Sequence, residues 1–139
     1  MTDLIRGSSL LHFKELVSSM GGDADAILRA QGVDPSMVGE YEFLIPYTSY
    51  AAAIGEAAIV LKCPDFGLRL GTEQGMSVLG PVSVLIRHSE TAACAIQGVC
   101  RFLYCCAPPD VAALKRTGRS AVFTLSVALR QVTYREQMV

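Results

Sequence analysis

The residues whose side chains could perform covalent or metal chemistry are few and scattered along this 139-residue chain. Its two histidines, His12 and His88, have no cysteine, aspartate or glutamate at the spacing of a helical metal-binding pair. The sequence also has no GxSxG nucleophile motif and no glycine-rich phosphate loop. We therefore expect no enzyme activity, no bound metal and no cofactor.

The five cysteines are the strongest rival signal for chemistry, because four of them fall on one predicted helix: Cys94, Cys100, Cys105 and Cys106. Adjacent Cys105 and Cys106 would point about 100° apart on a helix, so a disulfide between them would be strained. The odd total and the absence of a CxxC spacing favour small, reduced core residues. Redox sensing is the alternative, and it would require a reactive thiolate.

Composition predicts one compact domain over residues 1–139. Hydrophobic residues make up 51% of the chain, and charged residues interrupt every apolar run before it reaches the roughly 18 residues of a membrane span. The first residues lack the pattern of a signal peptide, so we expect a cytoplasmic protein. The net charge of -1, without a basic block, gives no surface for a phosphate backbone.

Helical periodicity dominates the first three quarters of the chain. Ser8 and Ser9 are predicted to cap a first helix that reaches Met20, and Asp23 is predicted to cap a second one. The later helices are predicted at Tyr47–Lys62, at Asp65–Leu70 with Gly71 closing it, from Pro81 onward, and at Glu90–Ala107 with Ser89 as the cap. The last of these is expected to be the longest.

After Pro108 and Pro109 the periodicity changes to the alternation of a β-strand. Residues 111–116 and 121–129 are predicted to pair as a hairpin through the turn at 117–120. The fold class is therefore α+β: a bundle of short and medium helices followed by an antiparallel hairpin or small sheet. A hairpin alone is marginal in water, so it must pack on the helices or meet further strands. Residues 131–139 are expected to begin another helix.

Several strings, in this order, resemble the N-terminal "arabinose-binding" regulatory domain of AraC-type transcription regulators. They are GVDPSMV, IPYTSY, PDFGLRLG and LGPVSVLIRHSETAACAIQGVCRFL, followed by the alternating hairpin. The resemblance implies an effector-sensing, often dimerising domain that precedes two helix-turn-helix units. Those units are not in this chain, so the domain is expected to be truncated, and DNA would be contacted only through the missing half. The natural relay toward it would be residues 130–139.

Given that resemblance, we expect a mostly apolar pocket with a few orienting polar groups. The candidate ligand-binding residues are tyrosines and arginines near apolar faces: Tyr47, Tyr50, Arg69, Arg87, Arg101 and Tyr104. The alternative for each is a place at the core edge or on a solvated helix face. The low charge favours a small, largely apolar effector. The rival function is a dimerisation or interaction module without an effector, and a homodimer is compatible with both functions.

Overall fold

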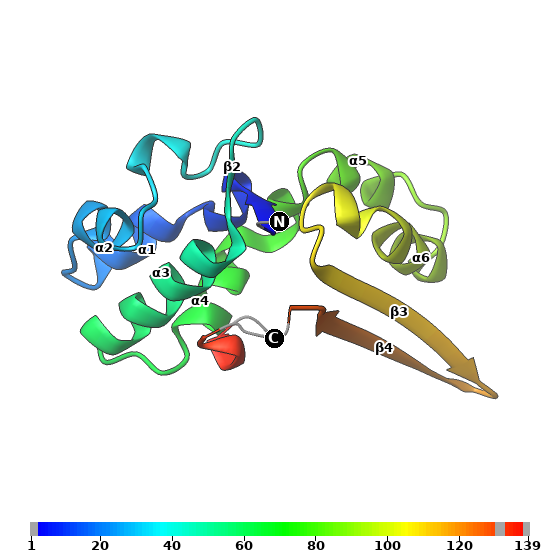
Figure 1. Ribbon diagram of the computed structural model, residues 1–139. Helices are drawn as coiled ribbons and strands as arrows, with labels where there is room; N and C mark the ends of the chain where they lie inside the picture. Colours follow the sequence, from blue (N-terminus) through cyan, green and yellow to red (C-terminus); the bar gives the residue numbers. More distant parts are fainter. Residues whose placement is uncertain (1–2, 130–132, 138–139) are drawn as a thin grey trace.

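The computed structural model describes residues 3–129 and 133–137, and Figure 1 shows their arrangement. The helices within these ranges are α1 (Phe13–Ser19), α2 (Ala24–Ala30), α3 (Tyr47–Val60), α4 (Phe66–Gln74), α5 (Pro81–Arg87) and α6 (Ala92–Phe102). The strands are β1 (Leu4–Arg6), β2 (Leu44–Pro46), β3 (Asp110–Thr117) and β4 (Ser120–Val127). Helices α1–α4 and the β1–β2 pair form one group, and α5, α6 and the β3–β4 hairpin form a second.

The hydrophobic core lies in the first group and is centred on α3. This helix buries its alanine-rich face, including Ala51, Ala53 and Ala57, because small side chains let neighbouring elements approach closely. The rings of Phe13 in α1 and Phe66 in α4 meet edge to face, with centroids 5.7 Å apart. This core positions α3 and α4 side by side, and the candidate site described below lies between them.

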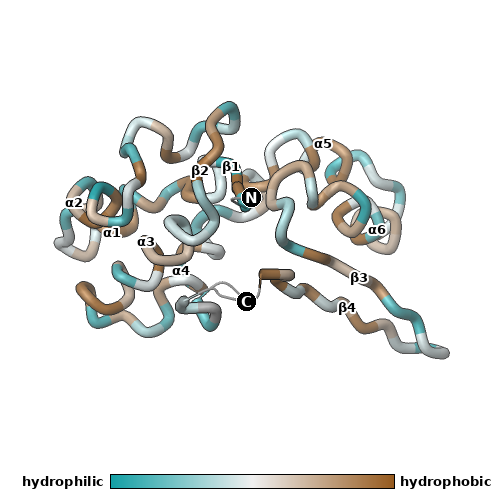
Figure 2. The backbone as a smooth tube through the Cα atoms, viewed as in Figure 1, coloured by the Kyte–Doolittle hydropathy of each residue, from teal (hydrophilic) through white to brown (hydrophobic). Residues whose placement is uncertain are grey.

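The second group is less buried. In the β3–β4 hairpin, Asp110 pairs with Val127 and Leu114 pairs with Phe123 in an antiparallel register. The hairpin packs on α6, yet none of the residues of α6 is fully buried. Figure 2 shows apolar segments in α5, α6 and the hairpin as well as in the first group. Apolar side chains such as Val122 and Phe123 therefore remain exposed in this part of the molecule.

The predicted fold class is confirmed: helices come first, and an antiparallel hairpin follows them. The small β1–β2 sheet was not expected, because three-residue strands carry too short a pattern to detect. Of the prediction for residues 131–139, positions 133–137 are described and contain the 3-10 turn Arg135–Gln137, while the rest lies outside the described residues. Among the described helices, none is long and apolar enough to cross a membrane.

Several predicted helix boundaries were wrong. The first α-helix begins at Phe13, after a separate 3-10 turn at Gly7–Leu10, so Ser8 and Ser9 do not cap it. Helix α4 continues through Gly71 to Gln74. Thr91, not Ser89, caps α6, and its side-chain oxygen accepts a hydrogen bond from the Cys94 amide at 3.1 Å. Helix α3 is longer than α6.

Candidate functional site

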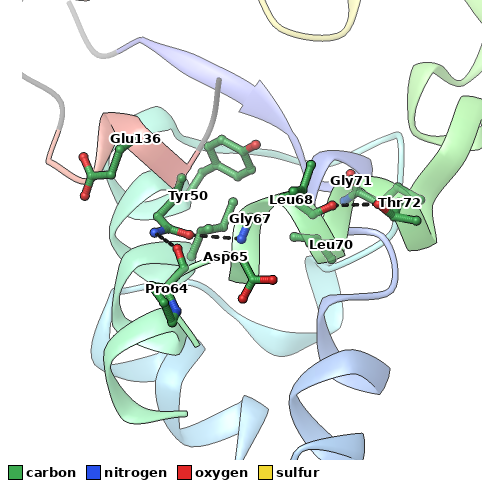
Figure 3. A pocket seen from close by; sticks show the side chains of 12 residues that line it. Tyr50, Pro64, Asp65, Gly67, Leu68, Leu70, Gly71, Thr72 and Glu136 are labelled. Carbon is green, nitrogen blue, oxygen red and sulfur yellow. Dashed lines mark hydrogen bonds between the residues drawn. The ribbon is translucent and has the colours of Figure 1, made fainter. Parts of the chain in front are cut away.

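A pocket of about 380 Å³ lies between α3, α4 and the segment that follows the hairpin (Figure 3). Its lining residues are Tyr50, Ile54, Pro64, Asp65, Gly67, Leu68, Leu70, Gly71, Thr72, Gln74, Glu136 and Gln137. The volume falls within the range of small-molecule sites, which is about 300–1,000 Å³. Exposed lining residues, including Leu68 and Thr72, leave the pocket open on one side.

The side-chain amide of Gln74 fixes the last turn of helix α4, which forms one wall of this pocket. Gln74 is buried, and its Nε2 donates hydrogen bonds to the carbonyl oxygens of Ser9 (2.8 Å) and Leu11 (3.0 Å). A buried amide with two acceptors is satisfied, so it holds the helix in place at little cost. Gln74 thus anchors one wall of the pocket.

Tyr50 stands at the wall formed by α3, next to Tyr47. The two rings meet edge to face with centroids 5.3 Å apart. Burial, and to a smaller extent the negative charge of Asp110, raise the pKa of Tyr50 well above its usual range. Its hydroxyl therefore stays protonated and can donate a hydrogen bond to a bound molecule.

The Asp65 carboxylate at the opposite wall is neutralised locally. It accepts hydrogen bonds from the Cys63 thiol (3.2 Å) and from Arg69 Nε (3.0 Å). These two contacts lower the pKa of Asp65, while burial raises the pKa of Cys63. The charge of Asp65 is thus paired. Glu136 brings a second carboxylate to the lining, and the other lining residues are apolar or neutral.

The six candidate residues separate into two sets in space. Tyr50 lines the pocket, Tyr47 packs beside it in the core, and Arg69 lies on the neighbouring surface of α4. The remaining three belong to the α5–α6 region, away from this pocket: Arg87, Arg101 and Tyr104 are all exposed. Arg101 lies over the ring of Phe102, 5.4 Å from its centroid. A ligand role for each of the six stays a prediction.

Most residues of the pocket wall were not among the candidate ligand-binding residues predicted from the sequence. The string PDFGLRLG at residues 64–71 supplies Pro64, Asp65, Gly67, Leu68, Leu70 and Gly71. The available signal was the pair of glycines four positions apart in an otherwise helical stretch, since glycine lowers helix stability by about 1 kcal/mol relative to alanine. Gln137 carried no comparable signal, because only the fold brings it to α4.

The cysteines do not form a group around one site. All five are free thiols; Cys63 and Cys106 are buried, as predicted. Cys94 is exposed in the first turn of α6, so its interpretation as a core residue was wrong. Among the described residues, no cluster of three or more histidine, cysteine or acidic side chains could hold a metal ion.

The fold and the site together define a class of protein: a helical domain followed by an antiparallel hairpin, with a pocket of the size that binds small molecules. Residues 21–138 match the family model described as the arabinose-binding domain of AraC transcription regulators, N-terminal. The chain belongs to this family. The pocket and the hairpin both lie within the matched range.

Among curated proteins, the chain is similar to the HTH-type transcriptional regulator VirS of Mycobacterium tuberculosis, in strains CDC 1551 / Oshkosh and ATCC 25618 / H37Rv. In each case the identity is 31% over 105 residues, which are 76% of this chain. The matched part is 31% of the relative, so the chain spans about a third of the length of these regulators.

Proposed function

We propose that this chain is the ligand-sensing regulatory domain of a transcription regulator. The observation that supports it most is the pocket between α3 and α4, formed largely by the family string at residues 64–71. In this proposal a small, largely apolar effector binds there, with Tyr50 and neutral backbone groups orienting it. DNA binding would belong to a separate part of a longer protein, as the name HTH-type transcriptional regulator indicates for the relatives.

Sensing requires that the effector bind one arrangement of the regulator more tightly than another. An effector that binds the folded domain and not the unfolded chain also stabilises the fold, by about 2.7 kcal/mol when free ligand exceeds the Kd a hundredfold. A melting-temperature screen of the 139-residue chain against small apolar acids, alcohols, aromatics and sugars therefore tests the proposal. We expect apolar compounds to raise Tm. A shift produced by sugars alone would overturn the preference for an apolar effector.

The location of the binding site is tested by filling the pocket. Gly71 lines it, and a Cβ at this position meets no atom within 4 Å. Gly71→Leu should therefore enter the pocket and abolish the Tm shift. Gly98 in α6 offers the matched control, since it also has open space and lies outside the pocket. An equal ligand response in the Gly71→Leu and Gly98→Leu variants would place the binding site elsewhere.

The second candidate function is a dimerisation module, and the hairpin favours it. Val111, Val122 and Phe123 expose about half of their surface, and among the described residues no further strand pairs with either edge of β3–β4. Exposed edges and apolar side chains are features of surfaces that pair with another chain. Light scattering tests this candidate: it requires a dimer that Phe123→Ser dissociates, and a monomer would refute it.

A further inference from the structure

The segment after the hairpin returns to the first group of helices and lies against α3 and α4 (Figure 1). Its described residues are 133–137, and it ends in the 3-10 turn Arg135–Gln137. Glu136 and Gln137 line the pocket, so the segment forms a part of its wall next to α4 (Figure 3). Residues more than sixty positions apart in sequence thus enclose one site.

The Gln137 carboxamide is held by a matched pair of backbone groups. Its Oε1 accepts a hydrogen bond from the Gly67 amide at 3.0 Å, and its Nε2 donates one to the Pro64 carbonyl at 2.7 Å. Gly67 lies in the first turn of α4, where amides have no acceptor within the helix. The side chain of Gln137 therefore satisfies a backbone donor that α4 cannot satisfy itself.

Two glycines provide the space into which the segment packs. A Cβ at Gly55 would overlap the ring of Tyr134, and a Cβ at Gly67 would overlap the backbone carbonyl of Gln137. Both glycines lie inside helices without a positive φ, so the backbone conformation alone does not require glycine there. Gly71, one turn later in α4, has no neighbour within 4 Å of the same point. Of these three positions, the two beneath the docked segment therefore require glycine, and Gly71 does not.

We propose that Tyr134–Gln137 is a latch that completes one wall of the pocket, docked through the Gln137 carboxamide and packed on Gly55 and Gly67. Docking keeps Glu136 and Gln137 in the pocket wall, and release converts the pocket into an open groove along α3 and α4. The regulatory meaning of the latch rests on the proposed function, because it is the effector site whose wall the latch completes. The docking itself does not depend on that function.

Hydrogen exchange at single amides, followed by NMR on the ligand-free 139-residue chain, tests the docking. Gln137→Ala should accelerate exchange of the Gly67 amide at least tenfold, because this amide loses its acceptor. The Arg69 amide, bonded to the Asp65 carbonyl within α4, should keep its protection. Gln97→Ala, at an exposed glutamine of α6, is the control and should change neither amide.

The glycine variants test the latch from the opposite side. Gly67→Ala should release the segment and accelerate exchange of the Gln137 amide, which donates to the Tyr134 carbonyl when docked. Gly71→Ala makes the same substitution in the same helix without an overlap and should leave the Gln137 amide protected. Alanine favours a helix over glycine, so neither variant is expected to unfold α4.

Unchanged protection of Gly67 in Gln137→Ala, or of Gln137 in Gly67→Ala, would overturn the latch. Equal loss of protection at Gly67 and Arg69 would also overturn it, since Gln137 would then support the whole helix. No ligand enters these measurements. A failed latch therefore leaves the melting-temperature test of sensing intact, and a failed ligand screen leaves the exchange result standing.

Discussion

At the scale of single residues, Tyr47 connects the core to the hairpin. Its ring is almost completely buried, and its hydroxyl donates a hydrogen bond to Asp110 Oδ1 at 2.8 Å. Asp110 is the first residue of β3 and is partly buried. The contact joins the first residue of α3 to the first residue of the hairpin, so one hydroxyl helps to position the second group of elements on the first.

Tyr47→Phe should destabilise the folded chain by about 1–3 kcal/mol, because the partly buried Asp110 carboxylate loses a hydrogen-bond donor. Tyr104→Phe, at a tyrosine that is 62% exposed, should change the free energy of unfolding by less than about 0.5 kcal/mol. Urea denaturation of both variants measures the difference. Equal effects would show that the Tyr47–Asp110 contact contributes little.

The environment of Asp110 predicts that the free energy of unfolding depends on pH. Burial raises the pKa of Asp110 above its ordinary value of 3.8, and the hydrogen bond from Tyr47 opposes this by a smaller amount. The folded chain thus holds this proton to higher pH than the unfolded chain does. The contribution of Asp110 to the free energy of unfolding is therefore most favourable below pH 3.8 and declines as pH rises through the pKa of the folded state. In the Asp110→Asn variant the side chain at this position cannot ionise, so this pH dependence is lost.

The unfolding free energy of Asp110→Asn, relative to the original chain, should therefore increase between about pH 4 and about pH 7. Denaturation curves recorded across this range provide the measurement. A difference between the two chains that stays constant, or that shrinks toward neutral pH, would contradict the raised pKa.

At the scale of elements, the ends of helices depend on which polar side chain reaches the first amides. Ser89 and Thr91 both precede α6, and both are residue types that cap helices. In the structure Thr91 has extended backbone angles and caps α6, while the Ser89 hydroxyl donates to the Leu85 carbonyl at the end of α5. Two neighbouring residues thus serve two different helices.

Thr91→Ala should cost about 1 kcal/mol of stability through the lost cap of α6, and Thr91→Ser should restore most of it. Ser89→Ala should cost less than about 0.5 kcal/mol, because its hydrogen bond lies at an exposed helix end. Thermal unfolding of the three variants ranks these costs. A larger effect at Ser89 than at Thr91 would reverse the assignment of the cap.

At the scale of the whole molecule, the two groups of elements meet through apolar and polar contacts: Ala107 belongs to the hydrophobic core, Val127 of β4 packs against it, and polar contacts lie beside them. Arg6 is central among these polar contacts: its backbone amide donates to the Cys106 carbonyl at 3.3 Å, and its Nε donates to the Cys105 carbonyl at 3.4 Å. The guanidinium also lies 4.7 Å from the centroid of the Tyr41 ring. Arg6 thus adds partly buried polar contacts to the apolar contacts that join the two groups.

Arg6→Met should weaken the coupling between the two groups. We expect the van't Hoff enthalpy of thermal unfolding to fall below the calorimetric enthalpy, because the hairpin group can then unfold before the α3 core. Arg119→Met, at the exposed hairpin turn, is the control and should keep the two enthalpies equal. Equal enthalpies in Arg6→Met would show that contacts other than Arg6 join the groups.

The sequence by itself determined the order and type of the main elements. Periodicities of 3.6 and 2 residues are local properties, so the helix beginning at Tyr47 and the hairpin after Pro109 could be predicted from them. The Asp23 cap could also be predicted, since capping involves residues only three positions apart. The family string at residues 64–71 was recognisable, although its place in a pocket wall was not.

Only the tertiary structure decided which residues share a site. Tyr50 and Arg87 looked equivalent in sequence, yet Tyr50 lines the pocket and Arg87 lies exposed at the end of α5. The contact between Gln137 and Gly67 joins positions 70 residues apart. Such contacts depend on how buried faces pack over long sequence separations, and local propensity carries no information about that packing.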